Sequence, residues 1–181
     1  LANKASPPAA PEESALQRIE RSIDELMDIR NNSADFIREN RRLHLDGLLS
    51  KLIHGEIVSA SLAQDYMKKF DLHLCSPYVQ LIRLCSDDEA LLHPLVPLLR
   101  RHCGTSDGTE WHLISGRHDI KLFYFGATPH PSLAWVEQEL QEHAPDLITA
   151  VSEVHSGLTQ LAIAYEETQK IADHMRFLGK R

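Results

Sequence analysis

Apolar and polar positions alternate most regularly near the C-terminal end of the chain. Residues 147–154 are rich in β-branched and small apolar types. On extended backbone, apolar side chains fall on both faces: Ile148, Ala150 and Val154 on one, Leu147 and Val151 on the other. After a turn at Gly157, apolar residues recur at helical spacing: Leu158, Leu161, Ala162, Tyr165, Ala172 and Met175. The pattern predicts a strand covered on both sides, then an amphipathic helix that ends near Gly179 and turns Ala162 and Tyr165 toward the sheet.

The middle of the chain shows the same change between two-residue and helical periods. Strands are predicted over residues 78–85, 111–114 and 120–125, and the last two are separated by the hairpin signal of residues 115–119. Helices are predicted in four places: over 43–53 with a stop at Gly55, after Ser59 or Ser61, after Ser86 through Leu99, and from Leu133 to before Pro145. Residues 105–109 have the composition of a polar loop. The order of elements predicts an α+β domain with a ferredoxin-like antiparallel sheet flanked by helices.

The first part of the chain has the pattern of a linker followed by a long helical arm. Residues 1–11 contain three prolines and are predicted to form a linker, and residues 12–54 are predicted to form the arm. The arm carries a 3-4-3 apolar seam: Leu16, Ile19, Ile23 and Leu26, continued in register by Arg30, Ser33, Ile37 and Asn40. This spacing is typical of a two-stranded coiled coil, and the polar positions would lower its stability but fix its register. The alternative is a helix that packs on its own domain.

Two motifs carry a resemblance to a known family. Residues 158–168 follow Leu-x-x-Leu-x-x-Ala-Tyr-x-Glu-Thr, and residues 48–55 are Leu-Leu-Ser-Lys-Leu-Ile-His-Gly. Residues 36–181 thereby resemble the degenerate GGDEF-like domain of the nucleotide-cyclase superfamily. That domain lies upstream of the helix-turn-helix in YesN-type regulators of the AraC family and in regulators of the CdaR/PucR type. The chain departs from the usual motif at Ala164, where Ser is common, and at Thr168, where Ala is common.

The resemblance implies both a fold and a role. It implies that residues 55–181 form a GGDEF-like domain, and that a strand which usually follows the segment 177–180 is cut off. It further implies a signalling and dimerisation module of a transcription regulator, with a helix-turn-helix domain outside this sequence. A ligand-sensing scaffold domain without a DNA-binding partner is the alternative.

The hairpin predicts that the domain is not an enzyme. In an active diguanylate cyclase it carries Gly-Gly-Asp/Glu-Glu-Phe, but here only Gly116 and Asp119 correspond. The chain also lacks the phosphate-binding patterns G-x-x-x-x-G-K-S/T and G-x-G-x-x-G. We therefore predict no catalytic residues, no cofactor and no metal.

One acidic stretch supports a rival interpretation. Residues 86–89, Ser-Asp-Asp-Glu, directly follow the strand predicted over 78–85. In a catalytic GGDEF or class III cyclase domain, carboxylates at this place hold the metal under a triphosphate, which would give Asp87 and Asp88 that role. The structural interpretation is a capping box with Ser86 at the N-cap and Glu89 three residues later.

Composition restricts the partners of the fragment. The 181 residues carry a net charge of −7, which argues against direct binding of DNA or of an anionic membrane. The eleven histidines are scattered without zinc-site spacing, and the three cysteines form no C-x-x-C pair. The cysteine pattern predicts a cytoplasmic setting. The seam of the arm predicts a homodimer, and the family resemblance implies that DNA is contacted only through another domain. Because the sequence does not begin with Met, we expect it to be a piece of a longer protein, which could include a membrane anchor.

Overall fold

The computed structural model describes residue 27 and residues 36–74, 77–106 and 108–179. The chain divides into two compact units, Leu1–Arg42 and Leu43–Arg181. The described part of the first unit is mainly helical, at residues 36–42, and its side chains Phe36 and Ile37 are 69% and 65% exposed. The second unit begins at Leu43, so residues 43–53 of the expected arm belong to the globular unit.

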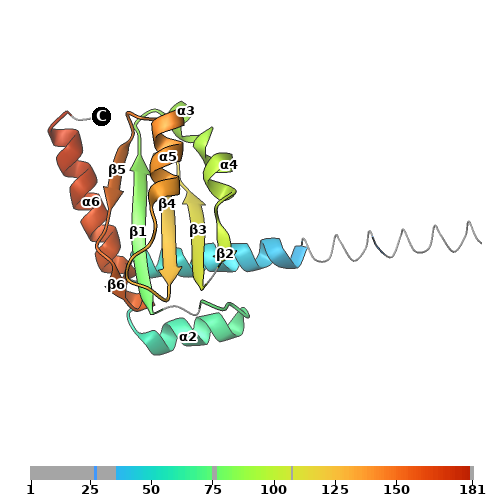
Figure 1. Cartoon of the computed structure of the whole chain (residues 1–181). Coiled ribbons are helices and arrows are strands. Elements are labelled where there is room, and N and C mark those ends of the chain that lie inside the picture. Colours follow the sequence, from blue (N-terminus) through green and yellow to red (C-terminus); the bar gives the residue numbers. More distant parts are fainter. Residues whose placement is uncertain (1–26, 28–35, 75–76, 107, 180–181) are drawn as a thin grey trace, which may run out of the picture. The chain divides into compact units, whose positions relative to one another are not determined.

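An antiparallel sheet forms the centre of the second unit (Figure 1). Its strands are β1 (Tyr78–Cys85), β2 (Gly104–Ser106), β3 (Thr109–Ser115), β4 (Asp119–Gly126), β5 (Ile148–Val151) and β6 (His155–Ser156). The order in the sheet is β2-β3-β4-β1-β5, and β6 also pairs with β1. The sequence order β1, helices, β3, β4, helix, β5 with the spatial order β3-β4-β1-β5 is consistent with a ferredoxin-like fold. The predicted α+β class is therefore confirmed.

Helices cover both faces of the sheet. They are α2 (Ala60–Lys69), α3 (Glu89–Leu92), α4 (Leu95–Arg100), α5 (Ala134–His143) and α6 (Leu161–Phe177), in addition to residues 43–53. One hydrophobic cluster joins residues 43–53, α2 and the start of α6 to Val79, Leu81, Phe123 and Phe125. A second cluster joins α3, α4 and α5 to Ile82, Leu84, Leu122 and Tyr124 on the opposite face. Successive residues of β1 and β4 thus enter different cores, as the two-residue period of a strand requires.

Several predicted elements are confirmed. Strand β1 spans residues 78–85 as predicted, and β3 and β4 form the predicted hairpin. Ser59 caps α2, because its hydroxyl accepts a hydrogen bond from the Leu62 amide. The turn at Gly157 has a φ of 92°, which only glycine adopts readily.

Other predictions were wrong in position. Strand β2 lies where a polar loop was expected. Its backbone pairs with residues 109–111 of β3, and this pairing does not depend on the polarity of its side chains. The strand predicted over 147–154 is shorter, because β5 ends at Val151, and the short strand β6 lies where the turn before Gly157 was expected. The helix predicted after Ser86 is two short helices, α3 and α4, with Pro94 at the N-cap of α4. Proline cannot donate the backbone hydrogen bond that a continuous helix needs there.

The contact face of α6 also differs from the prediction. Its buried residues are Leu161, Ala164, Thr168 and Ala172, while Ala162 is only partly buried. Tyr165 is partly buried too, but it packs against the core and the Arg83 guanidinium, as its predicted place on the sheet side requires. A 3-10 turn at Leu158–Gln160 precedes the helix. The α-helical spacing of apolar residues therefore begins at Leu161, and counting it from Leu158 gave the wrong face. Small side chains on the buried stripe let the helix approach the sheet closely.

Candidate functional site at the carboxyl end of β1

The end of β1 brings together the two segments that the sequence marked as candidate chemistry. Cys85, the last residue of β1, is opposite Asp119 of β4 on one side and Ile148 of β5 on the other. The Ser86 amide donates to the carbonyl oxygen of His118 at 3.2 Å, which extends this pairing into the hairpin. The acidic stretch 86–89 and the hairpin therefore lie at the same end of the sheet.

Asp119 is the centre of a buried charge network. Its Oδ2 accepts from Arg83 Nε at 3.0 Å and Nη2 at 2.8 Å, and its Oδ1 accepts from Lys121 Nζ at 2.7 Å. Arg83 Nη1 donates to Gln169 Oε1 of α6 at 2.6 Å, and its guanidinium lies 4.8 Å from the Tyr165 ring centre. Each of the three side-chain nitrogens of Arg83 thus donates to a protein group, either Asp119 of β4 or Gln169 of α6.

Sheet register explains why these charges meet. Arg83 is directly opposite Lys121 on β4 and Ala150 on β5, so Arg83 and Lys121 share a face. Burial alone would raise the pKa of Asp119, but the hydrogen bonds and charges of Lys121 and Arg83 outweigh it and hold that pKa below its ordinary value. The carboxylate is therefore ionised and fully engaged at neutral pH.

Gly116 belongs to the same arrangement. Its amide donates to the carbonyl oxygen of Asp119 at 2.7 Å, which closes the hairpin. A Cβ at this position would lie 2.5 Å from Asp119 Oδ1, closer than atoms tolerate. A side chain at position 116 would therefore displace the Asp119 carboxylate, which itself forms the buried ion pairs.

The carboxylates of the acidic stretch have structural partners as well. Asp88, not Ser86, is the N-cap of α3, because its Oδ1 accepts from the Ala90 amide at 2.9 Å. Ser86 Oγ accepts from the Asp88 amide one step earlier, at 3.0 Å. The predicted capping box is therefore wrong: the N-cap lies two residues later, and the N3 position is Leu91, which has no side-chain acceptor to complete the box. The Asp87 side chain is 91% exposed and lies 3.6 Å from Arg176 Nη2 of α6.

A cavity of about 530 Å³ opens beside this stretch. Asp87, Asp88, Asp146 and Arg176 line it, with the buried Cys85 at its base. Burial raises the pKa of the Cys85 thiol, so this group is a poor nucleophile at neutral pH. Within the residues that the structure describes, no three His, Cys, Asp or Glu side chains are grouped to hold a metal ion.

Sequence reasoning missed the cationic half of the site. Arg83, Lys121 and Arg176 were not singled out, and neither was Gln169. Arg83 did carry a signal, because it is a lone charge in a strand of otherwise apolar residues and one glutamine. A charge inside such a strand needs a buried partner, and the partner came from a different strand.

The histidines were interpreted as scattered, and several form separate pairs with carboxylates. Nε2 of His112 lies 2.5 Å from Asp46 Oδ1, His102 Nε2 lies 3.0 Å from Glu139, and His155 Nε2 lies 3.0 Å from Glu167. Each pair joins two different elements or a loop and a helix. These contacts give His102, His112 and His155 structural partners within the fold.

The predicted dimer seam falls almost entirely outside the described residues. Leu16, Ile19, Ile23 and Leu26 are not among them. Ile37 is described, and its side chain is exposed on the helix of residues 36–53. The seam therefore stays a prediction.

Comparison with known proteins adds no relatives. No family model, curated protein or solved structure matches the chain. In the described part of the chain, none of the helices has the length and apolar character needed to cross a membrane.

Proposed function

We propose that this chain is a non-catalytic signalling and dimerisation module of a cytoplasmic bacterial transcription regulator of the AraC type. In this proposal a helix-turn-helix domain outside the sequence contacts DNA. The helical arm joins two protomers and passes a signal to the globular unit. The regulator role comes from the resemblance of residues 158–168 and 48–55, and the non-catalytic part comes from the site.

One observation carries the non-catalytic part of the proposal. The acid that remains in the hairpin, Asp119, points into the protein and is neutralised by Arg83 and Lys121. Asp88 uses an oxygen to cap α3. A nucleotidyl transfer needs free carboxylates that can hold metal ions near a triphosphate, and both of these would first have to leave structural contacts.

The buried pair has a role that fits signalling. Arg83 connects the end of β1 to Gln169, and Gln169 Nε2 donates to both oxygens of Asp173 at 2.9 Å. A polar chain thus joins the centre of the sheet to the outer side of α6. Polar contacts of this kind have one good geometry, so they fix the position of α6 on the sheet more narrowly than apolar packing does.

A nucleotide-conversion assay tests the absence of catalysis. The chain is incubated with GTP or ATP and Mg²⁺ or Mn²⁺, and products are separated by chromatography. We expect no cyclic mononucleotide or dinucleotide. Product that is lost in the Asp87→Ala variant would overturn the proposal and establish a cyclase.

Two further measurements test the dimer and the regulator role. Sedimentation at micromolar concentration and disulfide trapping of a Leu16→Cys variant should both report a dimer, and a monomer without crosslink would remove that part. The coding sequence after Arg181 should encode a helix-turn-helix domain. A stop codon or an unrelated domain at that position would remove the regulator role and leave the ligand-sensing scaffold.

A further inference from the structure

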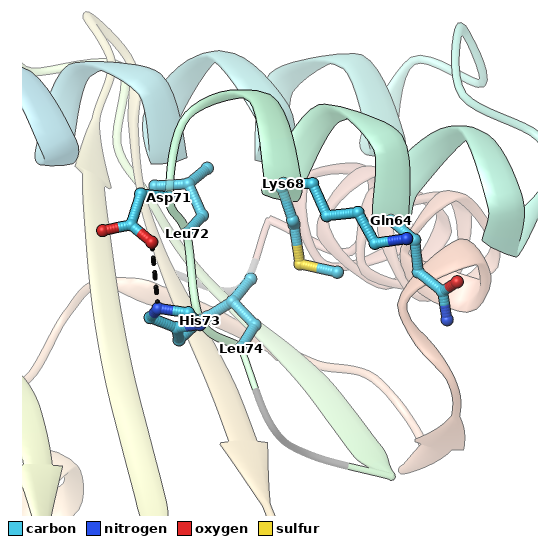
Figure 2. Close-up of a pocket in the computed structure, with 7 residues that line it drawn as sticks. Gln64, Lys68, Asp71, Leu72, His73 and Leu74 are labelled. Atoms are coloured by element: carbon cyan, nitrogen blue, oxygen red, sulfur yellow. Dashed lines mark ion pairs between the residues drawn. The ribbon is translucent and has the colours of Figure 1, made fainter.

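The end of α2 forms a second cavity, which shares no lining residue with the cavity at the end of β1 (Figure 2). Its volume is about 350 Å³, and its lining is mainly apolar, from Met67, Leu72 and Leu74. Leu72 and Leu74 are buried, with 5% and 8% exposure. The polar residues at the cavity are Gln64, Lys68, Asp71 and His73. Cavities that bind small molecules have this composition, an apolar body with a few polar groups, and begin at roughly 300 Å³.

The backbone that ends α2 builds this cavity. The Leu72 amide donates to the Met67 carbonyl at 2.9 Å and the Asp71 amide to the Lys68 carbonyl at 3.4 Å. With Asp71 at a φ of 50°, this is the Schellman arrangement that closes many helices. The turn reverses the chain, so Leu72 and Leu74 come to lie near Met67. The cavity is therefore fixed by the hydrogen bonds of the helix end.

The charged groups at the cavity lie at opposite sides of it. Asp71 Oδ1 lies 3.1 Å from His73 Nε2, so its carboxylate already has a partner. Lys68 takes part in none of the ion pairs formed among the described residues. Figure 2 shows Asp71 and His73 together at one side of the cavity and Lys68 with Gln64 at the other. The cavity thus pairs an apolar lining with an ammonium group and an amide that are free to accept an anionic head group.

We propose that this cavity binds a small amphiphilic monocarboxylate, with its apolar chain against Met67, Leu72 and Leu74 and its carboxylate at Lys68. Gln64 would donate a second hydrogen bond from its amide. The Asp71 carboxylate is the group at the cavity that would favour a cationic head group, and it lies at the opposite side, beside His73. This site is separate from the proposed regulator role, and either can fail alone.

Methionine methyl resonances give a direct test, because the chain has only three methionines, Met27, Met67 and Met175. The full chain is labelled with carbon-13 at these methyl groups and titrated with octanoate. We expect the Met67 signal to shift in a saturable way while the Met175 signal, from the cluster with Cys85, stays in place. No shift of Met67 at millimolar octanoate, or equal shifts of Met67 and Met175, would overturn the proposal.

The alkyl length and the head group of the ligand distinguish binding in the cavity from simple ion pairing with a surface lysine. Affinity should rise by about threefold to fourfold per methylene from butanoate to octanoate, as expected for burial of apolar groups. Octanoate should bind about tenfold more tightly than octylammonium or octanol, because only the carboxylate pairs with Lys68. Equal affinity for octanoate and octylammonium, or no dependence on chain length, would overturn the assignment.

Two variants on the exposed side of α2 keep the test independent of folding. Lys68→Met should remove the preference for octanoate over octanol, and Gln64→Trp should fill the cavity and abolish the Met67 shift. Lys69→Met is the matched control, because Lys69 lies over the Phe70 ring at 5.4 Å and does not line the cavity. An octanoate preference that survives in Lys68→Met, or is lost equally in Lys69→Met, would contradict the assigned role of Lys68.

Discussion

Replacement of Asp119 by Asn would test whether the buried charge network stabilises the second unit. The variant keeps the shape of the side chain but leaves the Arg83 guanidinium without its anion. The Arg83 and Asp119 side chains are 8% and 12% exposed, so water cannot replace the lost partner without local opening. Removing one member of a buried ion pair typically costs about 3–5 kcal/mol.

The structure places the expected cost of Asp119→Asn at the lower end of that range. Arg83 keeps its hydrogen bond to Gln169 and its contact with the Tyr165 ring, and Lys121 is 14% exposed and can turn toward solvent. We therefore expect a loss of about 3 kcal/mol in the free energy of unfolding. For a chain of this size this corresponds to a melting temperature lower by about 6–12 °C. Urea unfolding followed by circular dichroism at pH 7 would measure the change.

The pH dependence gives the same prediction a second readout. The folded-state pKa of Asp119 lies below its ordinary value of 3.8, so its stabilisation is present above that value and is lost as pH falls through the folded-state pKa. The difference between wild type and Asp119→Asn should be constant near neutral pH and shrink below about pH 4.

Controls for Asp119→Asn come from the same region. Asp87→Asn, whose side chain is 91% exposed, should change the free energy of unfolding by less than about 1 kcal/mol. Arg83→Met combined with Asp119→Asn should be less destabilising than the sum of the two single variants, because the two side chains interact. A loss in Asp119→Asn no larger than that in Asp87→Asn would refute the role assigned to the buried pair.

Three further predictions concern the other elements. Ala164→Asp should lower the free energy of unfolding by several kcal/mol and Ala162→Asp by clearly less, because of the two only Ala164 is fully buried on the sheet side of α6. Equal losses in chemical denaturation would contradict the described helix face. Asp88→Ala should lower the free energy of unfolding by about 1 kcal/mol in the same assay and Asp87→Ala by close to nothing, because Asp88 is the residue that caps α3. The reverse ranking would contradict that assignment. Burial raises the pKa of Cys103 from 9.0 to about 11. Iodoacetamide at pH 8 should therefore alkylate this thiol roughly a hundredfold more slowly in the folded chain than in the urea-unfolded chain, as measured by peptide mapping. Similar rates would disprove its burial.

The spacing of apolar residues was sufficient to predict the type and order of the main elements. The alternation in residues 78–85 and in the 111–125 hairpin gave strands, because a two-residue apolar period only buries side chains on extended backbone. Gly157 and Ser59 marked their turn and cap because the chemistry there is local: a positive φ needs glycine, and a hydroxyl caps a neighbouring amide.

Tertiary structure alone decided what each charged residue does. Asp119 is interpreted from sequence as the remnant of a catalytic acid, but the strand order puts it diagonally from Arg83, thirty-six positions away, and turns it into an ion-pair partner. The contact face of α6 was likewise set by the preceding 3-10 turn and by the shape of the sheet, which the helical period of the sequence does not contain. Patterns along the chain report how each segment buries its own apolar side chains. The pairing of charges depends on which strands become neighbours, and that is fixed only when all segments pack together.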